Sequence, residues 1–196
     1  MAEISVEQIK KLKELSGAGL TDAKKALVEA NGDFDKALEA MRKKGLTKAE
    51  KRGDRGTREG LVEAYIHDGR LGAIVEVNCE TSFVAKTDEF KTLAHQIAMQ
   101  IASMNPLYVS ENDIPEEARK AKIKELEANF KGPENMKEKI LEGQMKKAFA
   151  DKVLMNQPYI LDDTKTVEQF IKESIAKTGE NITIRQFKRI ELGVTE

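Results

Sequence analysis

Two alternating apolar segments, residues 61–68 and 69–78, meet at an Asp68-Gly69 pair and constrain this chain more than any other feature. An Asp-Gly pair between such segments predicts a β-hairpin with a two-residue turn. In that register the apolar side chains share one face. The facing pairs would be Ile66 with Leu71, Ala64 with Ala73, and Val62 with Val75. Leu61, Glu63, Tyr65, Ile74 and Glu76 would form the second face. A sheet must therefore stand among the helices predicted elsewhere.

The second segment of the hairpin runs into a polar break that is followed by Phe83-Val84 and a strongly amphipathic stretch. A helix is predicted from Thr87, with apolar residues at three- and four-residue spacing, and Asn105-Pro106 ends it. An aromatic residue at such a tip either covers the local core or is mounted rigidly as a protein-binding wedge. From the residues alone, both roles of Phe83 stay open.

The first 45 residues predict three short helices that form a small bundle. A capping box at Ser5 starts the first helix, and the glycines of residues 16–19 stop it. Thr21 is expected to cap the second helix. The third starts at Asp33 and is expected to stop at Gly45. A bundle of this size buries little surface, so a recognition module is expected.

Residues 46–60 interleave basic and acidic side chains with glycines, which is typical of a partly helical, mobile linker. The basic stretch at 42–58 also permits a nucleic-acid-binding hypothesis, which would predict binding that weakens steeply with salt. Acidic neighbours nearly halve its charge. Over the whole chain 33 Lys and Arg oppose 34 Asp and Glu, so no net field attracts nucleic acid or membrane.

Beyond residue 105 the pattern predicts further helices and a late strand. One helix starts at Pro115 and runs to about residue 130, and another spans about 134–156. A second capping box at Thr166 opens a helix that ends at Gly179. Residues 181–192 predict a strand whose phase slips between Ile184 and Phe187, which indicates a bulge or bend. The domain from 61 to 196 is thus expected to be α+β, with the last strand joining the hairpin.

Enzyme chemistry is not evident in the sequence. No glycine-rich phosphate loop follows a strand, and no Cys or His cluster has metal-ligand spacing. Cys79 with His67 or His95 could form a thiol–imidazole pair, but nothing supplies an orienting third group, and a buried strand-end cysteine is favoured. His95 is expected to be structural. We therefore expect no catalytic residue, no metal and no cofactor.

The single cysteine excludes an internal disulfide, and no apolar run has the length of about 20 residues that a membrane helix needs. The N-terminus lacks a signal-like apolar core. A cytoplasmic protein without a membrane segment is therefore expected.

Two stretches resemble the signatures of elongation factor Ts: residues 16–27, SGAGLTDAKKAL, and residues 76–85, EVNCETSFVA. Further matches are residues 140–147, 156–159 and 179–182. The similarity follows the family's order over almost the whole chain. It implies a guanine-nucleotide exchange factor that binds elongation factor Tu·GDP and promotes GDP release, so that GTP can load.

The resemblance also implies site residues. The family's small N-terminal domain of the ubiquitin-associated (UBA) type corresponds to residues 1–45, followed by the linker 46–60. In the family, the aromatic of a Thr-Asp-Phe-Val motif pushes between helices of the GTPase. Here Thr81, Phe83 and Val84 match this motif, and Ser82 replaces the Asp. Contacts near the nucleotide are expected from the first signature, at Leu20, Thr21, Asp22 and Lys24.

The length resembles the short form of the family, and leaves no room for the second core repeat, helical hairpin insertion and C-terminal module of longer relatives. The short form pairs through its core sheet as a homodimer that holds two copies of elongation factor Tu, without contacting nucleic acid directly. Lys188 stands where some short forms have a cysteine, so no intersubunit disulfide is expected there. The alternatives are a binding scaffold without exchange activity, an RNA-binding protein using residues 42–58, and a thiol enzyme at Cys79.

Overall fold

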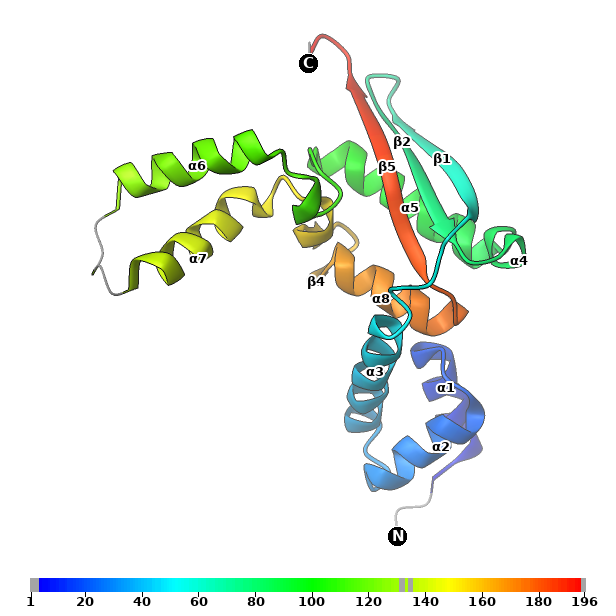
Figure 1. Cartoon of the computed structure of the whole chain (residues 1–196). Coiled ribbons are helices and arrows are strands. Elements are labelled where there is room, and N and C mark those ends of the chain that lie inside the picture. Colours follow the sequence, from blue (N-terminus) through cyan, green and yellow to red (C-terminus); the bar gives the residue numbers. More distant parts are fainter. Residues whose placement is uncertain (1–3, 131–132, 134–135, 195–196) are drawn as a thin grey trace. The chain divides into compact units, whose positions relative to one another are not determined.

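The computed structural model describes residues 4–130, 133 and 136–194. It is an α+β protein, as predicted: three helices come first, and an antiparallel sheet with further helices follows (Figure 1). The chain forms two compact units. One comprises residues 1–63, 76–95 and 169–185, and the other comprises 64–75, 96–168 and 186–196.

The N-terminal bundle consists of α1 (Val6–Ser16), α2 (Leu20–Glu29) and α3 (Phe34–Glu50). Its core gathers the small and aliphatic residues that recur at helical spacing: Leu12, Ala23, Ala26, Leu27, Ala37 and Met41. The capping box at Ser5 is present, since its hydroxyl accepts from Gln8 N and its own N–H donates to the Gln8 side chain. The predicted three helices are confirmed.

Two of the predicted helix ends are wrong. Gly19, not Thr21, is the N-cap of α2, so Thr21 lies inside the first turn. Helix α3 continues through Gly45 to Glu50. Gly45 has a packing role inside the helix, because a Cβ there would lie 3.1 Å from Ala176 Cβ of α8. A small residue is needed where the two helices approach so closely, and Gly45 supplies it within the helix.

The sheet has the order β1-β2-β5, with β1 at Glu59–His67, β2 at Leu71–Cys79 and β5 at Ile182–Glu191. Hydrogen bonds at both ends of the β2–β5 pair show that it is antiparallel: Asn181 N donates to the Glu80 side chain, and Leu192 N donates to Arg70 O. The late strand therefore joins the hairpin as predicted. Its buried positions shift from Ile182 and Ile184 to half-buried Phe187, which confirms the phase slip.

The hairpin is real, but its predicted register is wrong by one residue. Arg70 N donates to His67 O across Asp68 and Gly69, which both have positive φ, yet β2 starts only at Leu71, so the loop has three residues. A Cβ on Gly72 would lie 3.7 Å from Ile66 Cγ1, so these two residues share a face. A slip of one residue exchanges the two faces of a strand.

Burial shows which face is covered. On β2 the side chains of Ala73, Val75, Val77 and Cys79 are buried, whereas Ile74 is exposed. On β1 Leu61, Glu63 and Tyr65 are half-buried, whereas Val62, Ala64 and Ile66 are exposed. Of the six apolar residues expected on one face, the three on β1, Val62, Ala64 and Ile66, thus lie on an open face, whereas Ala73 and Val75 of β2 lie on the covered one. The additional loop residue is what places Val75 and Val77 on the covered side.

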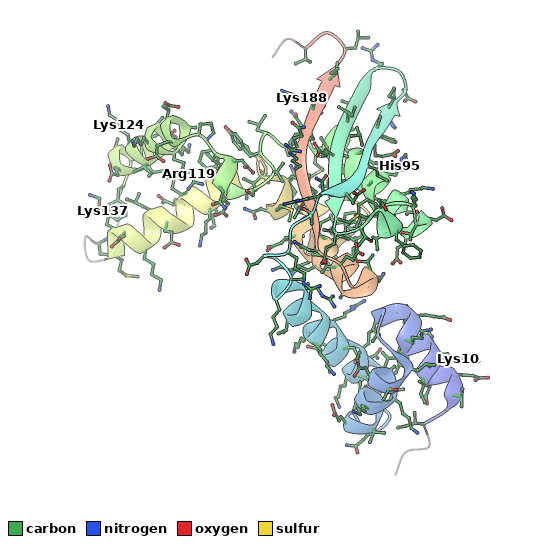
Figure 2. The ribbon with its side chains drawn as sticks, turned by 45° about the vertical axis from the view of Figure 1, so that its right-hand side comes forward. Lys10, His95, Arg119, Lys124, Lys137 and Lys188 are labelled. Carbon is green, nitrogen blue, oxygen red and sulfur yellow. The ribbon has the colours of Figure 1, made fainter. Side chains whose placement is uncertain are left out.

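The covered face lies against α5 (Asp88–Met104), as Figure 1 shows. The apolar stripe of this helix is buried from Phe90 to Ile101. His95 Nδ1 lies 3.0 Å from Glu63 Oε1 in the first unit, and Arg189 Nε donates to Ala102 O in the second. His95 is therefore a structural residue that joins α5 to β1 (Figure 2).

Helix α8 (Val167–Thr178) ends as predicted before Gly179, which has φ +78°. The 12-residue helix places buried Val167, Ile171 and Ile175 on one side. Its last turn contacts the N-terminal bundle in the first unit: a Cβ on Gly17 would lie 2.8 Å from Lys177 Cα. Since α1 ends at Ser16, the absence of a side chain at Gly17 permits this approach.

The second unit contains α6 (Glu116–Ala128) and α7 (Lys137–Ala150), which lie side by side as a hairpin of helices (Figure 1). Both helices were predicted, one from Pro115 to about residue 130 and one over about 134–156, whereas the absence of the helical hairpin insertion of longer relatives stays a prediction. Charged residues such as Arg119, Lys124 and Lys137 cover the pair (Figure 2). Apolar packing gathers at its base, around Ile114, Phe149 and Val153.

The long predicted helix over about 134–156 is also shorter in the structure, because α7 ends at Ala150 and a 3₁₀ turn covers Leu154–Asn156; residues 134–135 lie outside the described residues. A short hairpin of β3 (Pro158–Tyr159) and β4 (Asp162–Thr166) was not predicted. A second 3₁₀ turn covers Glu111–Asp113. Among the described helices, none combines the length and apolar content needed to cross a membrane.

Candidate functional site

The turn between β2 and α5 places Phe83 on the surface. Residues Ser82–Ala85 form the one-turn helix α4, and Phe83 is 80% exposed, the highest value among the large hydrophobic side chains described. The interpretation that Phe83 covers the local core is therefore wrong. Burial of apolar surface stabilises a fold, so this side chain contributes little to its own unit and is free for a partner.

The neighbouring residues of the motif anchor the turn. Val84 and Ala85 are each 8% exposed and pack inward. Val84, predicted as a partner contact beside Phe83, therefore holds α4 against the core and does not present an apolar surface. The Thr87 hydroxyl donates to Val84 O and accepts from Phe90 N, which joins α4 directly to the first turn of α5.

Thr81 caps the turn from the other side. Its backbone is extended, and its hydroxyl accepts a long hydrogen bond of 3.4 Å from Val84 N. Ser82 follows as an exposed residue at the first position of α4. A Ser at this position presents a hydroxyl where the family pattern has a carboxylate, so this chain offers no negative charge there.

A carboxylate from far along the chain completes this site. Glu180 Oε1 accepts from Thr81 Oγ1 at 2.6 Å, and Glu180 Oε2 accepts from Thr81 N at 3.0 Å. Both oxygens of one carboxylate thus bind one residue. Charge-assisted hydrogen bonds of this kind are stronger than neutral ones, so Thr81 is held firmly.

The residues expected from the first signature lie on α2. Leu20 is 52% exposed, and Thr21 and Lys24 are also exposed on the first turns. Asp22 is half-buried and its Oδ1 lies 3.3 Å from Lys44 Nζ of α3. On the opposite side of α2, Ala23 is buried in the core of the bundle. The two groups of predicted site residues therefore stand on different elements of the first unit, α2 and α4, and each presents an exposed apolar side chain.

The thiol chemistry considered for Cys79 has no support. Cys79 is fully buried, and its Sγ lies 3.2 Å from Thr81 O. Burial raises the pKa of the thiol above its ordinary value, which favours the unreactive protonated form. The His67 side chain is hydrogen-bonded to Tyr65, and the His95 side chain is hydrogen-bonded to Glu63. Within the described ranges, no group of three or more His, Cys, Asp and Glu is arranged to hold a metal.

Sequence reasoning missed Glu180 and its neighbour Asn181 as site residues. They belong to a matched motif at residues 179–182, but nothing local indicates that they meet the β2–α4 turn, because Thr81 and Glu180 are 99 residues apart in the chain. The Asn181 side chain is 2% exposed, and a buried amide usually has a structural partner. Only the pairing of β5 with β2 brings these residues together.

The comparisons with known proteins agree with the motifs. A family model described as elongation factor TS matches residues 3–194. Elongation factor Ts of Thermotoga maritima is 53% identical over 193 residues, which cover 97% of this chain and 97% of that protein. The protein of the same name from Rippkaea orientalis is 52% identical over 199 residues, covering 98% of this chain and 80% of that protein. The protein from Syntrophomonas wolfei is 50% identical over 194 residues, covering 97% and 91%.

Proposed function

Because this chain belongs to the elongation factor Ts family, we propose that it is a guanine-nucleotide exchange factor that binds elongation factor Tu·GDP and promotes GDP release. The observation that carries the proposal is the 80% exposure of Phe83 on a turn anchored by buried Val84 and Ala85. In this proposal the protein performs no bond chemistry of its own and needs no cofactor. It acts in the cytoplasm.

Exchange follows from linkage between two binding events. A protein that binds the nucleotide-free GTPase more tightly than the loaded form must weaken nucleotide binding by the same factor. Burial of one Phe side chain contributes about 1.5–3 kcal/mol, which is about one to two decades in an equilibrium constant. Phe83 alone therefore supplies part of the coupling. The exposed face of α2 around Leu20 and Lys24, on the module that we assign to the UBA type, supplies further contacts.

We assign the domains as residues 1–45 for this module, 46–60 for the linker, whose first residues continue helix α3 to Glu50, and 61–196 for the core. The core also offers a surface for self-association. Exposed Ile66, Ile74, Ile190 and Leu192 line a shallow apolar groove with Ala64 and Lys188 in the second unit. Pairing of two copies through this open face would cover it, and each homodimer would then hold two copies of elongation factor Tu.

The test is stopped-flow release of a fluorescent GDP from elongation factor Tu, with and without this protein. We expect strong acceleration by the wild type, and a loss of about 10- to 100-fold on Phe83→Ala with complex formation retained. Ile123→Ala, which removes an exposed apolar side chain on α6, is the matched control. It should accelerate GDP release from elongation factor Tu as much as the wild type does.

Binding without any acceleration would contradict the exchange function and leave the scaffold hypothesis. Acceleration that survives Phe83→Ala would retain the function and move its mechanism to α2.

A further inference from the structure

The β2–α4 turn and the α8–β5 turn of the first unit are joined by reciprocal hydrogen bonds. The Glu180 carboxylate accepts from both the N–H and the hydroxyl of Thr81. In return, the Glu80 carboxylate accepts from Asn181 N at 2.7 Å. Two successive residues of each turn thus bind two successive residues of the other. Such an arrangement fixes both the spacing and the orientation of the turns.

The same junction also holds the chain that leads from the N-terminal bundle. Asn181 Nδ2 donates to Gly53 O at 3.2 Å and to Arg55 O at 2.8 Å. The Arg55 guanidinium lies 3.5 Å from Glu80 Oε2. Residues 53–55 are therefore tied to the end of β2, and this part of the predicted linker has fixed partners.

Helix α4 needs this support because it cannot be stable alone. A single turn of helix fixes several dihedral angles for few hydrogen bonds, so isolated turns do not persist in water. Phe83 gives the turn little packing, since it is 80% exposed. On one side α4 is held by buried Val84 and by Thr87. On the other side Thr81 is held by Glu180.

We propose that Glu180 is a positioning residue for nucleotide exchange, holding Thr81 so that Phe83 is presented to the GTPase in one orientation. The inference rests on the proposed exchange function. A wedge that is ordered before binding does not have to lose conformational freedom when it inserts. Loss of Glu180 therefore lowers the rate of nucleotide release at saturation, while contacts made by the N-terminal module maintain the binding of elongation factor Tu·GDP.

The chemistry of Glu180 predicts how each substitution behaves. Ala removes both acceptors and leaves the Thr81 N–H and hydroxyl without this partner. Gln retains an acceptor for the Thr81 N–H, and its amide can donate to the hydroxyl, which then acts as the acceptor. We therefore expect Glu180→Gln to preserve most of the positioning that Glu180→Ala removes.

The experiment measures GDP release from elongation factor Tu over a range of concentrations of each full-length variant. Glu180→Ala is expected to lower the saturating rate by about tenfold with the half-saturating concentration changed by less than about twofold. Glu180→Gln should recover most of the rate. Glu117→Ala, on exposed α6, is the matched control and should be indistinguishable from the wild type.

A double-mutant cycle separates positioning from general destabilisation. If Glu180 acts through Phe83, Glu180→Ala should have no further effect in a Phe83→Ala background. An equal loss in both backgrounds would overturn the proposal, and so would a wild-type rate for Glu180→Ala. Thermal unfolding of each variant identifies a folding defect, in which case Thr81→Val, which removes the hydroxyl that donates to Glu180, replaces Glu180→Ala in the cycle.

Amide hydrogen exchange of the free protein distinguishes a failure of the proposed exchange function from a failure of the positioning role of Glu180. We expect the amides of Val84 and Ala85 to exchange faster in Glu180→Ala. If this occurs but the wild type does not accelerate GDP release, the proposed function fails, and the role of Glu180 in exchange fails with it. If the wild type is active and these amides are unchanged in the variant, the positioning role alone is overturned.

Discussion

At the scale of single residues, the site depends on a contrast between neighbours. Phe83 is exposed, whereas Val84, one position later, is buried. The contrast arises because one turn of helix points successive side chains about 100° apart, so a residue can anchor the turn while the one before it faces solvent. Glycines set equally strict local conditions, and Gly60 is the clearest case in the sheet. Its φ is +151°, and a Cβ there would lie 2.2 Å from Val77 O.

Gly60→Ala should therefore destabilise the protein by at least about 2 kcal/mol, because an added methyl group clashes with the backbone of β2 and φ is unfavourable. Urea unfolding followed by circular dichroism measures the change. Gly69→Ala is the control, since Gly69 also has positive φ but its Cβ would meet nothing within 4 Å. The control should cost only about 1–2 kcal/mol. Equal losses in the two variants would show that the clash at Gly60 is unimportant.

At the scale of elements, polar side chains fix helices to the turns beside them. In the second unit Gln100 of α5 is fully buried, and its Nε2 donates to Gln157 Oε1 and to Pro158 O. Its Oε1 accepts from Ile160 N at 2.8 Å. Gln157 in turn donates to Met104 O and Asp151 O. One amide thus connects the end of α5 to the β3–β4 hairpin.

Gln100→Ala should lower the free energy of unfolding by about 2–4 kcal/mol, because it leaves a cavity and removes the partners of buried polar groups. Thermal and urea unfolding would measure the loss. Gln96→Ala, one turn earlier on the same helix and half-buried, should change stability by about 0.5 kcal/mol or less. A loss at Gln100 no larger than the loss at Gln96 would contradict the connecting role.

At the scale of the whole molecule, the open face of the sheet in the second unit exposes apolar side chains to solvent. Ile66 is 72% exposed and Ile190 is 75% exposed, and both line the apolar groove described above. Exposed apolar surface on two edge strands favours association, because association removes it from water. The groove offers the surface through which the proposed homodimer would form.

Ile190→Lys should convert the proposed homodimer to a monomer, because a further charged side chain in this apolar groove would lose its hydration when the groove is covered. Analytical ultracentrifugation of the wild type and the variant measures the change. Ile123→Lys on α6 is the control and should sediment with the same oligomeric state as the wild type. A wild-type protein that sediments as a monomer at micromolar concentration would contradict pairing through this face.

The sequence by itself determined the elements whose signals are local: the capping box at Ser5, the three N-terminal helices, the strongly periodic α5 and the phase slip in β5. These depend on the period of apolar residues and on caps a few positions apart, which a single sequence displays directly. The two long signatures likewise identified the family and the turn that carries Phe83.

Only the tertiary structure decided the register of the hairpin, the exposure of Phe83 and the contact between Thr81 and Glu180. The register depends on whether Arg70 belongs to the loop or to β2, and burial of Val75 against other elements settles this. Exposure is a property of the surroundings and not of the residue. The Thr81–Glu180 contact joins residues 99 positions apart, so it exists only after β5 has paired with β2. Patterns within a few residues of the sequence do not indicate contacts between residues so far apart.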